Sequence, residues 1–188
     1  MSQNVLANGL TFEEENNLIN LLLKVDPTMM GTRLFDAIAS KTVSLAIEAV
    51  CIRYKPFSKT LGIPEDELEL KNLQVYMTQR LPDDTAYPKE WHCPGSVVRP
   101  GDNFYNALNR LNQAEFGGMM FPRQFVADVN NRNEKRGHFL SKVYLCQFKG
   151  EENDRGKWFD INNLPKETVH FHRTKIIPVG LGAFVCQG

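Results

Sequence analysis

The sequence predicts an α+β fold built around a mixed β-sheet, and three observations point to it. Residues 43–54 alternate in polarity and are rich in β-branched side chains, which is typical of a strand. Residues 104–115 repeat apolar side chains at helical spacing. Strand patterns recur on both sides of that helix, and a chain that mixes strands with helices in this way buries the helices against the sheet.

Two helices are predicted before the first strand. Thr11 and Glu14 have the spacing of a capping box, and leucines recur at helical period through residue 25. Asp26-Pro27 ends this first helix, because the residue before a proline is biased away from helical geometry. A second, short helix is predicted over residues 33–39.

These helices suggest a division of the 188-residue chain into a helical extension, residues 1–42, and one main domain, residues 43–188. The sequence leaves two roles open for the extension. It could cover an edge of the sheet, or it could form a contact between two copies of the chain.

The rest of the sheet is predicted from two further strand patterns, at residues 124–129 and 138–148. Residues 130–137 are polar and are predicted to be a turn between these two. Residues 55–71 contain two prolines and an acidic run, which is typical of a surface insertion.

The C-terminal part is predicted to contain little regular structure. Residues 166–173 fit a short helix. The tail that follows, IIPVGLGAFV, is rich in glycine and apolar side chains, and it is predicted to be an extended packed segment rather than a helix.

Composition excludes several classes of partner. Lys+Arg and Asp+Glu number 22 each, so no basic excess indicates nucleic-acid binding. A net charge near zero leaves a homodimer open. The start, MSQNVLANGL, does not resemble a signal peptide, and no apolar stretch is long enough to cross a membrane. The four cysteines form no C-x-x-C pair. Because the sequence shows neither a signal peptide nor a membrane-spanning stretch, we expect a soluble cytoplasmic protein with reduced thiols.

Chemistry is concentrated in residues 92–118, HCPGSVVRPGDNFYNALNRLNQAEFGG. This stretch follows the outline G-x5-E-x7-R-E-U-x-E-E-x-G-U, in which U is a bulky apolar residue. Without gaps, the first glycine, the first glutamate and the arginine of the outline fall on Ser96, Asp102 and Arg110. The E-U-x-E-E core falls on Leu111, Asn112, Ala114 and Glu115.

This outline resembles the box of the Nudix hydrolase superfamily, and three other segments agree with it. Residues 75–84 resemble the strand that precedes the box, including its terminal arginine. Residues 88–95, with Trp91 before a Pro-Gly turn, are similar to the entry to the box, and residues 156–165 resemble the "WFxxxxLP" segment. The resemblance implies an α/β fold, specifically a Nudix-type α/β/α sandwich with a mixed sheet and an N-terminal helical extension.

The resemblance also implies an activity, the hydrolysis of the pyrophosphate bond of a nucleoside diphosphate linked to another moiety. Such a reaction uses Mg²⁺ or Mn²⁺ held by carboxylates, with a nucleotide-type small molecule as the partner. On the matching positions, Glu115 and Arg110 are the candidate catalytic residues, Arg80 and Arg99 the candidate substrate-binding residues, and Glu115, Asp102, Glu151 and Glu152 the candidate metal ligands.

Two glutamates of the core are missing, since their positions carry Leu111 and Ala114. Shifting the match by one residue puts Arg110 on the first of these positions and restores no acid. Two interpretations stay open: a site that binds metal through other acids, and a helix that faces the core. The alternative functions are therefore an inactive nucleotide-binding or regulatory module and a structural or interaction protein.

Two histidine patterns are weaker candidates. His170 and His172 would share one face of a strand, as a transition-metal site requires, but would diverge on a helix. His92 and Cys93 are adjacent, so on a strand they point to opposite faces, which argues against a nucleophile–base pair.

Overall fold

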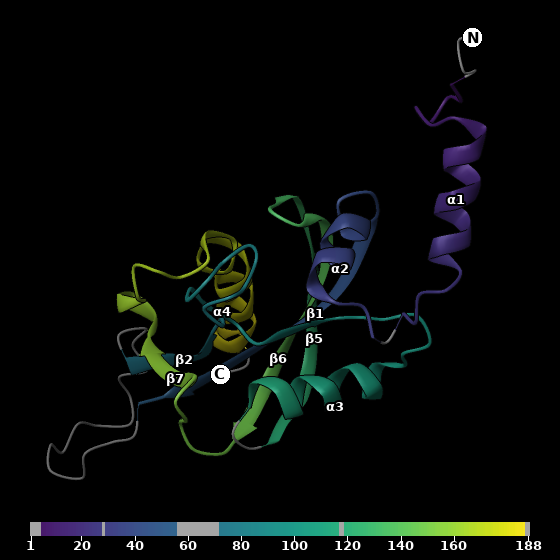
Figure 1. Ribbon diagram of the computed structural model, residues 1–188. Coiled ribbons are helices and arrows are strands. Elements are labelled where there is room, and N and C mark those ends of the chain that lie inside the picture. The colour runs from purple at the N-terminus through teal and green to yellow at the C-terminus, as the bar shows by residue number, and fades with distance from the viewer. Residues whose placement is uncertain (1–4, 28, 56–71, 117–118, 187–188) are drawn as a thin grey trace, which may run out of the picture.

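A computed structural model describes residues 5–27, 29–55, 72–116 and 119–186 (Figure 1). The predicted insertion at 55–71 lies almost wholly outside the described residues. The elements, in chain order, are α1 (Phe12–Leu22), α2 (Thr32–Ala39), β1 (Val43–Tyr54), β2 (Leu73–Gln79), β3 (Trp91–His92), β4 (Gly95–Val97), α3 (Phe104–Glu115), β5 (Met119–Glu134), β6 (Gly137–Lys149), β7 (Gly156–Asp160), η2 (Ile161–Asn163), η3 (His172–Ile176) and α4 (Ile177–Val185). No helix among the described residues has the length and apolar character needed to span a membrane.

The described strands form one mixed sheet in the order β3-β2-β1-β6-β5, with β4 paired to β1 and β7 paired to β2. Strands β1 and β6 run parallel, and the other pairs are antiparallel. The central position of β1 explains its composition, because a strand with neighbours on both sides and helices on both faces is buried along most of its length.

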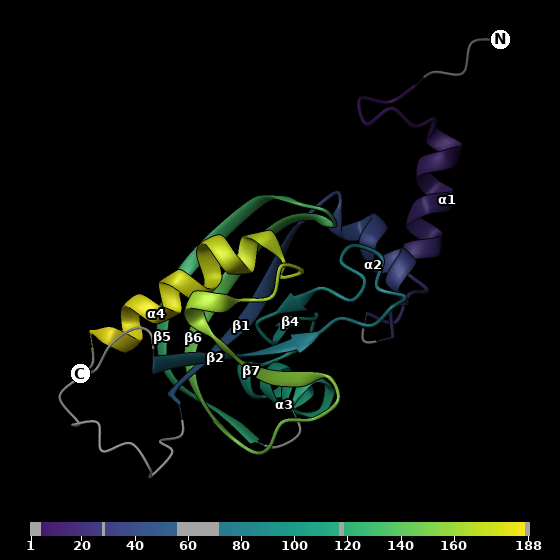
Figure 2. The same ribbon diagram turned by 90° about the vertical axis from the view of Figure 1, so that its left-hand side faces the viewer.

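Each face of the sheet has its own core. Ile47, Ala49 and Cys51 of β1 pack with Leu108 and Leu111 of α3. The alternate residues of β1, including Val50 and Ile52, pack with η3 and α4 on the opposite face. Figure 2 shows α3 and α4 on opposite sides of the strands. The predicted α/β fold with a mixed sheet is confirmed.

Local signals placed the first elements correctly. The capping box is present, since the Thr11 hydroxyl accepts from the Glu14 backbone N–H while the Glu14 carboxylate accepts from the Thr11 backbone N–H. The second helix and the first strand also form where they were predicted, as α2 and β1. Cys51 and Cys146 are buried small side chains that face one another across β1 and β6, as the strand patterns indicated.

The predicted polar turn at residues 130–137 is wrong. Strand β5 continues through Glu134, and only Lys135 and Arg136 connect it to β6. The polar run belongs to an edge strand, whose outer face needs no apolar side chains. Gly137 begins β6 with φ +138°, and a Cβ there would collide with the carbonyl oxygen of Ala39, so this hairpin end is held against the end of α2.

The predicted extended tail is also wrong, because η3 and α4 form a continuous helical segment that covers the sheet. Its two glycines suggested a non-helical segment, yet Gly180 lies directly on Val50 of β1. The close approach of helix and sheet requires a residue without a side chain at that position, and the buried contacts of Ile176 and Ile177 stabilise the helix.

Replacing Gly180 with alanine is expected to destabilise the protein by about 1–3 kcal/mol, as overpacking does. The added Cβ would lie 2.5 Å from Val50 Cγ1, so helix and strand must separate. Gly182→Ala in the same helix is the control, since nothing lies within 4 Å of its added Cβ, and higher helix propensity should stabilise it slightly. Urea unfolding of both variants measures the difference; equal midpoints would contradict the close contact.

Candidate functional site

The loop that leads into α3 is held by an ion pair between Asp102 and Arg110. The guanidinium of Arg110 donates to both carboxylate oxygens of Asp102, at 2.7 and 3.1 Å, and to the backbone carbonyl of Val97 at 2.8 Å. Arg110 thus pairs with Asp102 rather than with the neighbouring position 111, which carries a leucine. The guanidinium also holds the pKa of the Asp102 carboxyl below its usual range. Both residues serve to shape the loop.

Glu115, at the end of α3, turns toward the sheet. Its carboxylate accepts a short hydrogen bond from the Thr78 hydroxyl of β2 and lies 3.5 Å from His92 Nε2 of β3. Burial raises the pKa of Glu115, opposed by the hydrogen bond from Thr78. Burial also lowers the pKa of His92, so this ring is neutral at pH 7. The cluster fastens the end of α3 to the sheet.

The other two core positions offer no ligand for a cation. Leu111 is 1% exposed and belongs to the core, and Ala114 lies on the surface. Among all the described residues, no group of three or more His, Cys, Asp or Glu side chains could hold a metal ion. The donor set of this helix therefore does not fit the divalent metal that the resemblance implies, because Mg²⁺ requires several oxygen ligands in a fixed geometry.

The acids of the segment before β7 are placed differently from the expectation. Glu151 and Glu152 are both exposed. One carboxylate oxygen of Glu152 accepts from the Trp158 backbone N–H at 2.8 Å, so this side chain closes its own loop onto β7. The structure does not bring either acid into a metal-binding group with Glu115 or Asp102.

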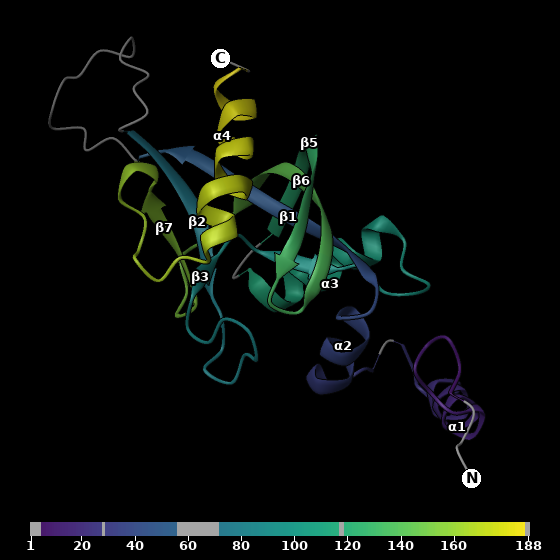
Figure 3. The ribbon, with the colours of Figure 1, turned by 90° about the horizontal axis from the view of Figure 1, so that it is seen from above.

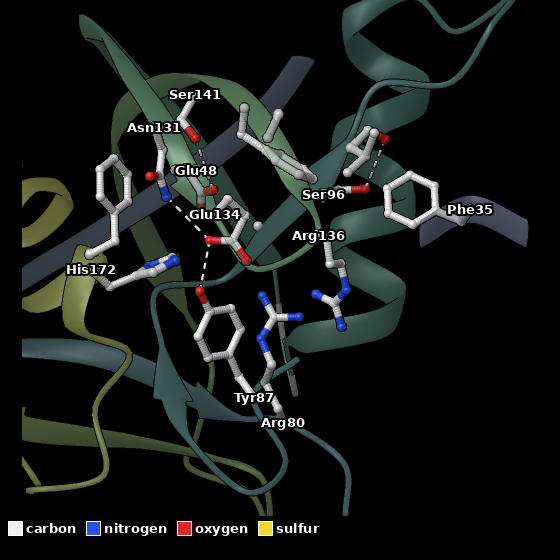
Figure 4. Close-up of a pocket in the computed structure, with 15 residues that line it drawn as sticks. Phe35, Glu48, Arg80, Tyr87, Ser96, Asn131, Glu134, Arg136, Ser141 and His172 are labelled. Carbon is white, nitrogen blue, oxygen red and sulfur yellow. Dashed lines mark hydrogen bonds between the residues drawn. The ribbon is translucent and has the colours of Figure 1, made fainter. Parts of the chain in front are cut away.

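A polar cavity lies on the opposite face of the sheet, where β1, β5 and β6 meet η3 and the loop that follows β2 (Figure 4). Its volume is about 110 Å³. Glu48, Ser141 and Glu134 line it from the strands, His172 lines it from η3, and Arg80 lines it from the end of β2. Apart from Arg80, these charged and hydrogen-bonding groups were not among the residues expected to bind substrate or metal.

Glu48 is buried at the floor of this cavity, with 8% of its surface exposed. Ser141 donates to Glu48 Oε1 at 3.4 Å, while Oε2 has no hydrogen-bond partner among the described residues. Gly95 of β4 lies against the carboxyl group so closely that a Cβ would collide with it. Burial raises the pKa of Glu48 to about 8, although the nearby Arg80 opposes the shift, so the neutral acid predominates at pH 7.

His172 forms another wall and is 6% exposed. The backbone N–H of Cys93 donates to His172 Nδ1 at 3.2 Å, which fixes the proton of the neutral ring on Nε2. Burial, with the charge of Arg80 adding to it, lowers the pKa of His172 to about 3. His172 therefore presents an imidazole N–H donor to the cavity, and its ring stays neutral at physiological pH. His170 is exposed on the same helical segment, so the H-x-H pair diverges.

Asp84 binds two arginines that line the cavity, Arg80 and Arg136. Its carboxylate accepts from Arg136 Nη2 at 2.7 Å, from Arg80 Nη1 at 3.2 Å, and from the backbone N–H groups of Ala86 and Tyr87 at 3.0 and 2.8 Å. Burial alone would raise the pKa of Asp84, but these hydrogen bonds lower it well below its usual range. One carboxylate thus orients two guanidinium groups at the cavity.

The same network joins three parts of the chain. Arg136 also contacts Asp36 of α2 at 3.1 Å, so the β5–β6 hairpin is tied to both α2 and the loop after β2. The hydroxyl of Tyr87 donates to Glu134 Oε2 at 2.9 Å, and Asn131 Nδ2 donates to the same atom at 3.2 Å (Figure 4). Such a network fixes the rotamers of the lining side chains before any ligand arrives.

An outer groove of about 740 Å³ adjoins the cavity and shares Tyr87, Asn131 and Phe171 with it. Arg132, Lys135 and Lys175 line this groove. Their positive charge, next to the two arginines of the cavity, favours an anionic ligand. The two arginines predicted to bind substrate are separated, since Arg80 lines the cavity and Arg99 lines a groove beside α3.

Sequence reasoning did not assign a role to Glu48, Asp84 or Arg136, and it considered His172 only as part of a metal-binding pair with His170. A signal existed for Glu48, because it is the one acid in the middle of the apolar strand VSLAIEAVCIRY. A charge at an inward position of a central strand is rare unless it is paired or functional. The other three carry no such local signal.

Comparison with solved structures identifies the architecture. A MutT/nudix family protein from Enterococcus faecalis has a TM-score of 0.55 at 15% identity, covering 91% of this chain and 69% of its own. A Nudix hydrolase from Nitrosomonas europaea has a TM-score of 0.52 at 15% identity, covering 78% of this chain and 90% of its own. The fold is that of the Nudix superfamily. The Nudix domain of Shewanella oneidensis NrtR, in complex with ADP ribose, has a TM-score of 0.50 at 14% identity, covering 88% of this chain and 97% of its own.

The likeness to the Nudix fold is one of structure. No protein-family model matches the sequence, and no curated protein matches it either. The fold expected from the sequence is thus confirmed. Its function depends on the side chains, because one fold can carry many functions.

Proposed function

We propose that the protein is a Nudix-fold domain that binds a nucleotide-type ligand in the polar cavity and outer groove, without metal-dependent hydrolysis. The observation that carries this proposal is the contrast between the two faces of the sheet. On the α3 face, Leu111 and Ala114 supply no carboxylate beside Glu115, and the Glu115 carboxylate accepts a hydrogen bond from Thr78. On the other face, Arg80, Glu48 and the rest of the cavity form a prearranged polar site.

The dimensions of the site support a ligand with a small hydroxylated or heterocyclic group and an anionic group. The cavity of about 110 Å³ admits only the former, and Glu48 with His172 offers both hydrogen-bond donors and acceptors to it. The outer groove of about 740 Å³ has room for phosphates beside Arg132 and Lys175. The ADP-ribose complex of the NrtR Nudix domain supports this class of ligand.

Binding is tested with ADP-ribose, a dinucleoside polyphosphate and a nucleotide sugar, each with and without Mg²⁺ or Mn²⁺. We expect at least one of them to stabilise the protein by about 2–4 kcal/mol at saturation, measured as a shift in thermal unfolding. Chromatography of the same samples should show no product. No stabilisation by any of them would contradict the proposal.

Two arginine variants locate the ligand. Arg80→Met removes a charge from the cavity and should weaken binding by roughly tenfold or more, because a charge-assisted hydrogen bond to an anion is lost. Arg99→Met removes the same charge from the groove beside α3 and should leave binding unchanged. Calorimetric titration measures both. The reverse order of effects would place the ligand on the α3 face.

The second candidate is the hydrolase that the resemblance implied, acting on a nucleoside diphosphate linked to another moiety. The names of the solved structures with this fold favour it. It requires Mg²⁺ or Mn²⁺, and Glu115 is the box carboxylate left to serve it. Metal-dependent product that disappears in Glu115→Gln would support this candidate and overturn the binding module.

We retain a cytoplasmic location as part of the proposal. Cys51, Cys93 and Cys146 are buried, Cys186 is exposed, and all four are free thiols. Free thiols are typical of a reducing compartment. Cell fractionation tests the location, and recovery of the protein from a membrane or secreted fraction would contradict it.

A further inference from the structure

Helix α1 has no face that the described part of the chain buries. None of its 11 residues is buried, and Phe12, Leu21 and the following Leu23 are 69%, 62% and 80% exposed. In all three views of the ribbon, α1 lies apart from the sheet and its covering helices (Figures 1, 2 and 3). A helix of this length is marginally stable in water by itself, so an exposed apolar side indicates a missing partner.

The apolar side chains of α1 are arranged for one-sided docking. Leu18, Ile19 and Leu22 recur at helical spacing on one side, and each is exposed. The opposite side carries Asn16 and Asn20, which are also exposed. Leu18, Ile19 and Leu22 thus form an apolar stripe that can lie in a groove, and Glu15 continues the same side toward the N-terminus of the helix.

A groove of matching character lies elsewhere on the same chain, between α2, β4 and α3. Its volume is about 700 Å³. The side chains that line it are mainly apolar, among them Met30, Ile38, Val97 and Val98. Its floor includes Leu111 and Ala114, the two positions where the Nudix pattern would place glutamates.

We propose that α1 of a second copy of this chain lies in this groove, and that the exchange is reciprocal, giving a two-fold symmetric dimer. In the single chain, an apolar helix and an apolar groove are both left open, and each has the chemistry to cover the other. Reciprocal exchange covers the apolar helix and the apolar groove of both copies in one closed two-fold dimer. Ala114 then lies beneath the docked helix, at a position where the Nudix pattern would place a glutamate.

The area of such an interface is sufficient. An 11-residue helix is about 16 Å long and about 10–12 Å wide, so docking one side buries roughly 400 Å² of helix and a similar area of groove. Two reciprocal contacts bury on the order of 1,600 Å², the size of a stable specific interface.

Charge also permits self-association. The chain has no net charge, so two copies do not repel one another. The first turn of α1 carries Glu13, Glu14 and Glu15, while the rim of the groove carries Arg99 and Arg110, the second of which is paired with Asp102. The acidic first turn disfavours a parallel pairing of two α1 helices, because like charges would then lie side by side.

Sedimentation velocity of the full chain over a concentration series tests the proposal. Wild-type protein is expected to be dimeric in the micromolar range. Leu18→Glu with Leu22→Glu should raise the dissociation constant at least roughly 30-fold, because two apolar side chains in a buried contact are replaced by charges. Asn20→Glu adds the same kind of charge to the polar side of α1 and should leave the dimer intact.

A groove variant identifies the surface that receives the helix. Ala114→Arg changes an exposed residue of the groove floor and should also give monomers. Mixing it with the Leu18→Glu/Leu22→Glu protein should restore heterodimers through the one intact helix–groove contact. Since the described part of the chain buries no residue of α1, substitutions on this helix should leave the fold intact.

Three results would overturn the proposal. Wild-type protein that stays monomeric at about 100 µM, a concentration far above that at which an interface of this size associates, would show that no second copy docks. A dimer that persists in Ala114→Arg would place α1 on another surface, such as a second α1. A dimer that tolerates Leu18→Glu/Leu22→Glu would exclude α1. None of these results bears on ligand binding in the polar cavity, which is tested separately.

Discussion

Replacing Glu48 with glutamine is expected to leave the free energy of unfolding unchanged at pH 4 and to raise it by about 3–5 kcal/mol at pH 8. The carboxyl is buried, and Glu48 Oε2 has no partner among the described residues, so its charged form is disfavoured in the folded state. Glutamine is similar in shape and remains neutral at every pH. Denaturant unfolding of both proteins between pH 4 and pH 9 measures the difference.

The sign of this effect follows from the direction of the shift. The pKa of Glu48 is raised from 4.5 to about 8 on folding, so between these values the unfolded chain releases a proton that the folded chain keeps. The wild-type contribution is therefore fully present below pH 4.5 and is lost as the pH rises toward 8. Glu151→Gln makes the same chemical change at an exposed position and serves as the control. Parallel stability curves for wild type and Glu48→Gln would contradict the buried neutral acid.

Replacing Asp84 with alanine is expected to destabilise the protein by about 3–5 kcal/mol at pH 7, the cost of breaking a largely buried charge network. The substitution leaves the guanidinium of Arg136 with Asp36 as its one carboxylate partner among the described residues, beside the Thr85 hydroxyl. It also leaves two backbone N–H groups, of Ala86 and Tyr87, without their acceptor. Urea unfolding measures the loss. Binding of ADP-ribose should fall in the same variant, because Arg80 and Arg136 lose the group that orients them.

Acid should reduce the difference between Asp84→Ala and wild type. The pKa of Asp84 is lowered on folding, so its contribution is present above the pKa of the unfolded chain, about 4, and is lost as the pH falls through the lower folded value. The neighbouring Asp83, which is exposed, serves as the matched control, and Asp83→Ala should change stability by less than about 0.5 kcal/mol. Equal effects of the two substitutions would show that Asp84 is not the centre of this network.

Elements with local signals were predictable from the sequence. The capping box at Thr11 and the alternation of β1 depend on neighbours in the sequence, and both formed as predicted. Helix α4 was missed because its stability comes from a distant contact, the packing of Gly180 on Val50, which local propensity does not describe. The end of β5 was missed because its polar residues belong to the exposed face of an edge strand.

The candidate site was likewise predictable only where its residues are close together in the sequence. Spacing found Asp102, Arg110 and Glu115 within one loop and helix. The cavity was not found, because the residues that form its contacts are far apart in the chain: Glu48 and Ser141 are separated by 93 positions, and Cys93 and His172 by 79. Register between β1 and β6 brings such pairs together, and that register depends on the whole sheet rather than on any short motif.

The irregular pairing of β5 has a consequence for solubility. As the last strand of the sheet, β5 presents unpaired backbone groups together with exposed Met119, Phe121 and Phe125, which is a template for adding strands from other chains. Register shifts beside Pro122 and Phe125 bend this edge, and Pro122 lacks a backbone N–H to donate. A strand straightened by deleting one residue here would expose a flat apolar edge, and the protein would then be prone to edge-to-edge aggregation into fibrils.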